Sequence, residues 1–249
     1  MKTSKVIMIT LIAGITAILC TTILAVGILN FKKTGTGSGV TATGSASCDF
    51  ESDLIVWRGN YSAYGITTAD AYGVIKQDAE VIKNYLLKNG ITEDEMVFSS
   101  VDISQNYNAQ YNMDGEYIGD VPEGFNLSQE VSITSTDVDK VEKISRDISA
   151  LIESGVEFTS NSPEYYYTKL DELKLQLIVQ ATANAKQRID IITAGSGAKT
   201  GDLLSANLGV FQITAQNSAS DEYSYGGTLD TTSRNKTATI TVKLSYTTK

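Results

Sequence analysis

The sequence predicts an α+β fold, in which a mainly antiparallel sheet packs with three helices behind one N-terminal transmembrane helix. Three observations support this prediction. A strand–helix–glycine–strand pattern occurs twice, at a spacing of about 65 residues. A longer amphipathic helix follows, and the chain closes on alternating strands. With 249 residues and 42% apolar content, the chain is long enough to bury a sizeable core.

The first element is an apolar segment, Val6 to Leu29, that contains no charged residue. As a helix it would be ~36 Å long, which is enough to cross a bilayer. It is longer than the apolar part of a cleavable signal peptide and lacks a clear cleavage site. We therefore expect a signal-anchor over residues 1–33 and a flexible tether over residues 34–39. The short preceding tail favours an extracytoplasmic location for residues 34–249, with residues 40–249 as the outer domain.

The first strand–helix unit opens with a β-rich stretch, Leu54–Tyr64. Thr67 or Thr68 is the expected cap of the following helix, which runs to about Asn89 and ends at Gly90. One face of this helix carries apolar residues at helical spacing. These are Ala71, Val74, Ile75, Ala79, Ile82, Tyr85 and Leu86.

The second unit repeats this order. Alternation over residues 125–133 predicts a strand with one buried side. Thr136 is the expected cap of the next helix, and Gly155 its terminator. Apolar residues again recur every three or four positions. They are Val138, Val141, Ile144, Ile148 and Leu151.

A third, longer helix is expected from Pro163 to Ala194. Its apolar stripe consists of Leu170, Leu173, Leu177, Ala181, Ala185 and Ile189. Two strands should follow, near Leu208–Ile213 and Thr237–Tyr246, and the second alternates cleanly between apolar and polar residues. Residues 216–235 between them are predicted to form a polar loop.

The stretch Ile192–Gly201 (ITAGSGAKTG) invites comparison with a phosphate-binding loop. Aligning Lys199 and Thr200 with the end of that motif places Ala198 and Thr193 where its two glycines belong. The order of elements is also reversed, because a phosphate-binding loop follows a strand and opens a helix. We therefore predict that these glycines end the long helix.

The composition excludes several functional classes. The absence of histidine removes Ser-His-Asp and Cys-His catalysis and the usual zinc sites. All 29 acidic residues follow Cys48, whereas four of the 20 basic residues precede it. The outer part therefore carries a charge of about −13, which repels nucleic acid. We expect a protein that is not an enzyme, needs no cofactor or metal, and does not bind nucleic acid.

Tyrosines form the candidate contact surface. Residues 106–124 are typical of a hairpin with a turn at Met113–Glu116, and this hairpin carries three tyrosines. Such rings either bind a glycan or partner protein or pack across the two strands. A second group is expected at the start of the long helix. The hairpin tyrosines are Tyr107, Tyr111 and Tyr117, and the second group is Tyr165, Tyr166 and Tyr167. We expect another copy of the chain as the partner, or alternatively a cell-envelope glycan or protein.

Three acidic residues cluster before the first strand–helix unit. Alternation places Asp49, Glu51 and Asp53 on one face of a strand. They could bind Ca²⁺, act in acid–base chemistry, or form a solvated strand edge that discourages aggregation. The strand edge is the preferred interpretation.

The end of the long helix also carries an A-x3-A-x2-[KR]…G-x3-G pattern. Its residues are Ala181, Ala185, Arg188, Gly197 and Gly201. Four further features lie upstream, in an order that matches one protein family. They are VTATGSA (Val40–Ala46), Asp53, a T-x3-A helix start at Thr67, and STDVDKVEKISRDI (Ser135–Ile148). Over about residues 38–215 the chain resembles the SIMPL domain family, the group of the 26 kDa periplasmic immunogenic protein.

The resemblance implies an α+β extracytoplasmic or envelope protein that is able to form homo-oligomers and has no established catalytic activity or cofactor. It supplies no functional residue that could be carried over to this chain. Ser52 stands where the family usually has proline, and Ile189 and Thr193 interrupt the alanine ladder of the long helix. These departures concern close packing more than the fold.

Overall fold

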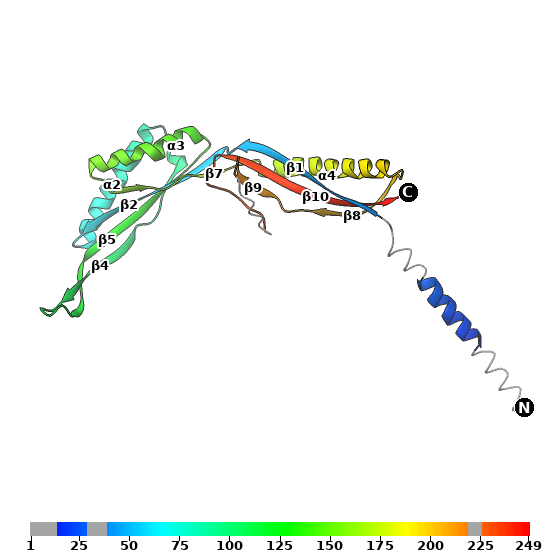
Figure 1. Cartoon of the computed structure of the whole chain (residues 1–249). Helices are drawn as coiled ribbons and strands as arrows, with labels where there is room; N and C mark the ends of the chain where they lie inside the picture. The colour runs from blue at the N-terminus through cyan, green and yellow to red at the C-terminus, as the bar shows by residue number, and fades with distance from the viewer. Residues whose placement is uncertain (1–13, 29–38, 219–225) are drawn as a thin grey trace, which may run out of the picture. The chain divides into compact units, whose positions relative to one another are not determined.

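A computed structural model describes residues 14–28, 39–218 and 226–249 (Figure 1). The chain divides into two compact units. Unit 1 comprises Met1–Ala46, Ile178–Gly209 and Ile240–Lys249, and unit 2 comprises Ser47–Leu177 and Val210–Thr239. Each unit therefore joins segments that are far apart in the sequence.

The expected membrane anchor falls only partly on described residues. Residues 14–28 form an exposed α-helix, whereas residues 6–13 and 29 of the apolar segment lie outside the described part. Residues 34–38 of the expected tether also lie outside it. Within the described residues, no helix is both long and apolar enough to span a bilayer.

Unit 2 contains a six-stranded sheet whose pairings are all antiparallel, as predicted. Two long strands form its centre, β2 (Leu54–Gly65) and β5 (Tyr117–Ser135). Short strands β6 (Phe158–Ser160) and β7 (Glu164–Tyr166) pair with β2. The strands that pair with β5 are β3 (Met96–Phe98) and β4 (Asp102–Tyr111).

Two helices of unit 2, α2 (Thr68–Lys88) and α3 (Val138–Asp147), contact β2 and β5 (Figure 1). Thr67 caps α2 by accepting the Asp70 N–H at 3.2 Å, which confirms the predicted start. The predicted cap of α3 was wrong by one residue. Asp137 rather than Thr136 caps it, because the Asp137 carboxylate accepts the Lys140 N–H at 3.2 Å.

The core of unit 2 lies between these helices and the sheet. It includes fully buried residues from all four elements, each of which gains about 1.5–3 kcal/mol from burial if large and apolar. They include Ile55, Trp57, Leu127, Val131, Ile133, Ala71, Ile75, Ile82, Leu86 and Val141. A 3₁₀ helix, η2 (Ile148–Ser154), continues α3 and ends at Gly155, whose φ of 86° favours glycine. The predicted glycine terminator is thus confirmed.

The helix predicted from Pro163 to Ala194 begins later. α4 spans Leu170–Gly195, and Glu164–Tyr166 forms β7 instead. The reason is tertiary, since Tyr165 lies opposite Ile55 and Tyr166 opposite Leu54 in the pairing with β2. Of the predicted apolar stripe, Leu170 is half-buried and the other residues are buried. These are Leu173, Leu177, Ala181, Ala185 and Ile189.

A second, four-stranded sheet has the strand order β1 (Gly39–Glu51), β10 (Asn235–Thr248) and β8 (Thr200–Leu208), and its fourth strand, β9 (Gln212–Ala215), pairs with β10. α4 approaches β1 very closely. A Cβ atom on Gly44 would lie 2.2 Å from Ala185 N and 2.3 Å from Ala181 O. Small residues on both elements are therefore required here.

Side chains of α4 also bond the backbone of β1. Asn184 accepts the Ser45 N–H at 3.2 Å, and Arg188 donates to the Thr43 carbonyl at 3.1 Å. These bonds tie α4 directly to the backbone of β1.

The glycine-rich turn behaves as predicted. Gly195 ends α4, Gly197 has a φ of 76°, and Ala198 N–H donates to Thr193 O at 3.0 Å before β8 begins. The strand predicted near Leu208–Ile213 was wrong, because the chain there divides between β8 and β9 (Gln212–Ala215). The last strand alternates as expected, with Ala238, Ile240, Val242 and Leu244 buried.

Candidate functional site

The predicted tyrosine hairpin is a two-stranded ribbon formed by β4 and β5. Pairing between β2 and β5 stops at Gly65 and Phe125, whereas β4 and β5 continue to the turn (Figure 1). We call residues 106–124 the ribbon. At its tip Asn112 Oδ1 accepts two backbone N–H groups, and Gly115 adopts a φ of 82°. The predicted turn is therefore confirmed.

The ribbon presents its tyrosines to solvent. Tyr107, Tyr111 and Tyr117 are 58%, 62% and 56% exposed. Tyr111 lies opposite Tyr117, and their rings meet edge-on with centroids 6.0 Å apart. The cross-strand packing considered for these tyrosines thus occurs while their surfaces stay accessible. Further exposed apolar side chains of the ribbon are Met113, Ile118 and Val121.

The second tyrosine group is half-buried and held by intramolecular contacts. Tyr165 donates to Glu142 Oε1 at 2.7 Å, and Tyr166 donates to Glu164 Oε2 at 3.0 Å. Tyr167 packs on Phe50, with ring centroids 4.8 Å apart. The structure places this group on and just after β7, not at the start of a helix as predicted.

The three clustered carboxylates each have a different partner. Asp49 accepts Thr237 Oγ1 at 2.6 Å, Glu51 accepts Arg234 Nε at 2.6 Å, and Asp53 accepts Thr168 N and Oγ1 at 2.7 Å each. Hydrogen bonding from Thr237, together with Gln216, lowers the pKa of Asp49 below its ordinary value. In the part of the chain that the structure describes, no group of three or more acidic or cysteine residues could hold a metal ion.

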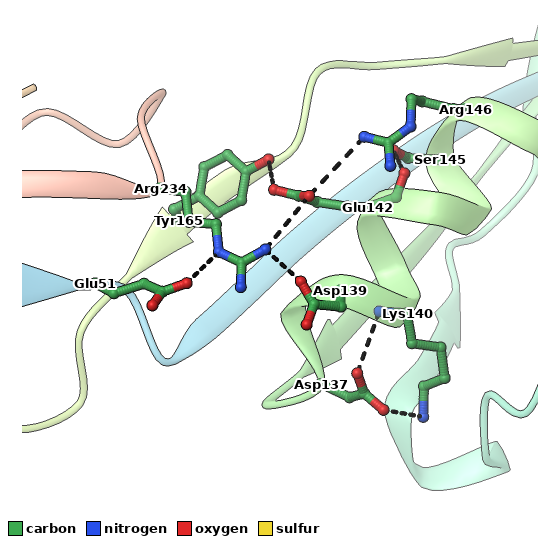
Figure 2. Close-up of polar contacts among 9 residues, drawn as sticks. All are labelled: Glu51, Asp137, Asp139, Lys140, Glu142, Ser145, Arg146, Tyr165 and Arg234. Atoms are coloured by element: carbon green, nitrogen blue, oxygen red, sulfur yellow. Dashed lines mark hydrogen bonds and ion pairs between the residues drawn. The ribbon is translucent and has the colours of Figure 1, made fainter.

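Arg234 is the centre of a polar cluster that sequence reasoning missed (Figure 2). Its Nε donates to Glu51, and its Nη1 donates to Asp139 and lies 3.5 Å from Glu142. These acids come from β1 and α3. Figure 2 shows the guanidinium group between them, with Tyr165 reaching the same Glu142.

The surroundings keep Arg234 protonated and the Tyr165 phenol neutral. The hydrogen bond to Asp139, opposed by partial burial and reinforced by Glu51, raises the pKa of Arg234. Burial raises the pKa of Tyr165 to about 12, with a further contribution from Glu142. The arrangement joins segments that are far apart in the sequence.

A shallow cavity of about 470 Å³ adjoins Arg234. Its lining comes from the end of β1 and the N-terminal end of α3: Glu51, Ser52, Asp53, Thr136, Asp137, Val138, Asp139 and Arg234. One sequence signal could have indicated this site. Arg234 is the only basic residue in the sequence of the polar loop 216–235, which makes it a candidate partner for acidic residues elsewhere in the chain.

Comparison with protein-family models gives a match over residues 40–246. The matching model is described as SIMPL: Protein of unknown function (DUF541). This range includes every strand of both units except the first residue of β1 and the last two of β10. Comparison with curated proteins gives no match.

Proposed function

Since the chain belongs to the SIMPL family, a family of unknown function, we propose that it is a non-enzymatic, membrane-anchored protein of the cell envelope. In this proposal residues 1–33 anchor the chain and the SIMPL domain lies outside the cytoplasm, where it associates with further copies of itself. The ribbon provides the contact surface for this association.

The ribbon is the observation that carries the proposal. A two-stranded hairpin without a third strand or a covering helix is only marginally stable in water. This one nevertheless exposes Tyr107, Tyr111 and Tyr117 together with Met113, which is fully exposed. Burial of these side chains against another copy would stabilise both the ribbon and the assembly.

The apolar segment Val6–Leu29 supports membrane attachment. The acidic surplus of the following chain supports a role away from nucleic acids. The missing histidine, and the bonds that Asp49, Glu51 and Asp53 each make within the chain, support a non-enzymatic role.

Light scattering on the full-length chain in detergent, analysed for protein mass, tests the assembly. We expect a discrete oligomer at micromolar concentration. Replacing Tyr107, Tyr111 and Tyr117 by serine should yield monomers. Tyr72→Ser is the matched control, because Tyr72 is 53% exposed on α2. A wild-type monomer, or an oligomer that the triple variant leaves intact, would contradict the proposal.

A second candidate function uses the same ribbon to bind an envelope glycan such as peptidoglycan. It is favoured by the exposed tyrosine pair Tyr111–Tyr117 beside amide and carboxylate side chains of the hairpin. Sedimentation of the chain with insoluble peptidoglycan tests it. Glycan binding that the triple serine variant loses, in a chain that stays monomeric, would favour this function over assembly.

A further inference from the structure

The tip of the ribbon holds two tyrosine rings against each other. Tyr111 and Tyr117 lie opposite each other in the last cross-strand pair before the turn, with ring centroids 6.0 Å apart and an interplanar angle of 69°. Among the residues that the structure describes, they form the only contact between two tyrosine rings. Both side chains are more than half exposed, so a reagent in solution reaches both rings.

One phenol of the pair has a proton acceptor beside it. Tyr117 donates a hydrogen bond to the Asp120 side chain, and this bond raises the pKa of the phenol above its ordinary value. The neutral phenol is a weak acid, but it becomes a very strong acid once it has lost an electron. A carboxylate within hydrogen-bond reach then takes the proton directly. The tip therefore combines two adjacent rings with a base for one of them.

We propose that Tyr111 and Tyr117 are an oxidative cross-linking site, at which hydrogen peroxide and a peroxidase join the two rings as dityrosine. Each phenol gives up one electron and one proton, and one peroxide molecule takes up both electrons and both protons to become two water molecules. The two phenoxyl radicals then form a carbon–carbon bond between ring positions ortho to the hydroxyl groups. The two hydrogens displaced from those ring positions move to the oxygens as protons.

The cross-link changes the ribbon itself. A two-stranded hairpin that is held only by its turn and its backbone hydrogen bonds is marginally stable in water. A bond between rings on opposite strands closes a covalent loop over residues 111–117 and removes open conformations, as a disulfide does. The site does not depend on the proposed assembly, because both rings belong to one chain.

Oxidation of the full-length chain in detergent with a haem peroxidase and hydrogen peroxide, followed by digestion after glutamate, tests the site. Cleavage after Glu116 separates Tyr111 from Tyr117 in the untreated chain. After oxidation we expect the two fragments to stay joined, with a mass two hydrogen atoms below their sum and with dityrosine fluorescence. Tyr111→Phe and Tyr117→Phe should each abolish this product. Tyr107→Phe should retain it and is the matched control, because Tyr107 is equally exposed on the ribbon and lies outside the ring pair.

The rate of cross-linking tests the proton acceptor. Asp120→Asn should slow formation of the joined product, whereas Asp114→Asn, which removes an exposed carboxylate of the turn, should not. An equal rate in both variants would overturn the role of Asp120.

Three results would overturn the cross-linking site. These are no joined product under conditions that couple free tyrosine, a joined product that survives Tyr111→Phe, or a link found only between two chains. The last result would still agree with self-association through the ribbon. A link within a chain that light scattering shows to be monomeric would instead support the site and contradict the assembly.

Discussion

Arg234 and Glu51 form a direct ion pair, with 2.6 Å between Nε and Oε1, although 183 positions separate them in the chain. Through its Nη1 the same guanidinium group reaches Asp139 of α3. One side chain thus links the end of β1, the segment before β10, and the helix that covers the sheet.

Replacing Arg234 by alanine should destabilise unit 2. The Arg234 side chain is 27% exposed, and its removal leaves Glu51, Asp139 and Glu142 without their shared cation. We expect a loss of about 1–2 kcal/mol in the free energy of unfolding, measured with urea. Arg234→Lys should recover only part of it, because lysine lacks the planar fork. An unchanged unfolding midpoint for Arg234→Ala would show that the cluster is energetically neutral.

Acid should weaken the fold partly through Glu95. Hydrogen bonds from Ser135 and from the Thr92 N–H lower the pKa of Glu95 below 4.5. A carboxylate whose pKa is lowered by folding stabilises the folded state at any pH above its pKa in the unfolded chain. This contribution is lost as the pH falls through its pKa in the folded chain. Stability should therefore decline below about pH 4.5, and less steeply in Glu95→Gln. The exposed Glu153→Gln is the control, and the idea fails if both variants follow the wild-type curve.

Raising the pH above 10 should lower the stability of the fold through ionisation of Tyr165. Burial, with help from Glu142, raises the pKa of this phenol from 10 to about 12. Its contribution to stability is complete below pH 10 and is lost as the pH rises through 12. Between these values the unfolding temperature should fall more steeply in the wild type than in Tyr165→Phe. Tyr72→Phe serves as the control, and parallel curves for wild type and Tyr165→Phe would exclude this role.

Replacement by alanine should change the free energy of unfolding in opposite directions at two glycines, Gly44 and Gly73. A Cβ atom on Gly44 would lie 2.2 Å from the backbone of α4, whereas Gly73 in α2 has no atom within 4 Å of the added group. Gly44→Ala should cost about 1–3 kcal/mol. Gly73→Ala should add about 0.5–1 kcal/mol through higher helix propensity. Equal midpoints for both variants in chemical unfolding would contradict the close packing of α4 on β1.

The proposed anchor predicts an asymmetric labelling pattern. In a chain with Cys20 and Cys48 replaced by serine, Met113→Cys should react with a membrane-impermeant maleimide in intact spheroplasts. Met113 is suited to this test because it is fully exposed at the ribbon tip. Ser4→Cys should react only after lysis, since the preceding tail is expected inside. Labelling of Ser4→Cys alone in intact spheroplasts would reverse the orientation.

Periodicity predicted the helices of unit 2 well. The stripe from Ala71 to Leu86 is visible in the sequence because a helix buries one face at fixed spacing, although Val74, expected on that face, is exposed. The end of the second helical segment at Gly155 was equally visible, because the left-handed backbone conformation that ends a helix there favours glycine. The same local rules identified ITAGSGAKTG as a helix end and the turn near Gly115 as a hairpin tip.

Long-range pairing decided what local patterns could not. Tyr165 and Tyr166 entered a strand because β2 offers them backbone partners, which a search for helix starts does not consider. The Arg234 cluster depends on contacts between residues that lie 92 to 183 positions apart. The sequence by itself therefore determined the helices of unit 2, the hairpin turn, the end of the long helix and the family resemblance. Only the tertiary structure decided which charges meet and which tyrosines remain exposed, because those depend on how distant strands are brought into register.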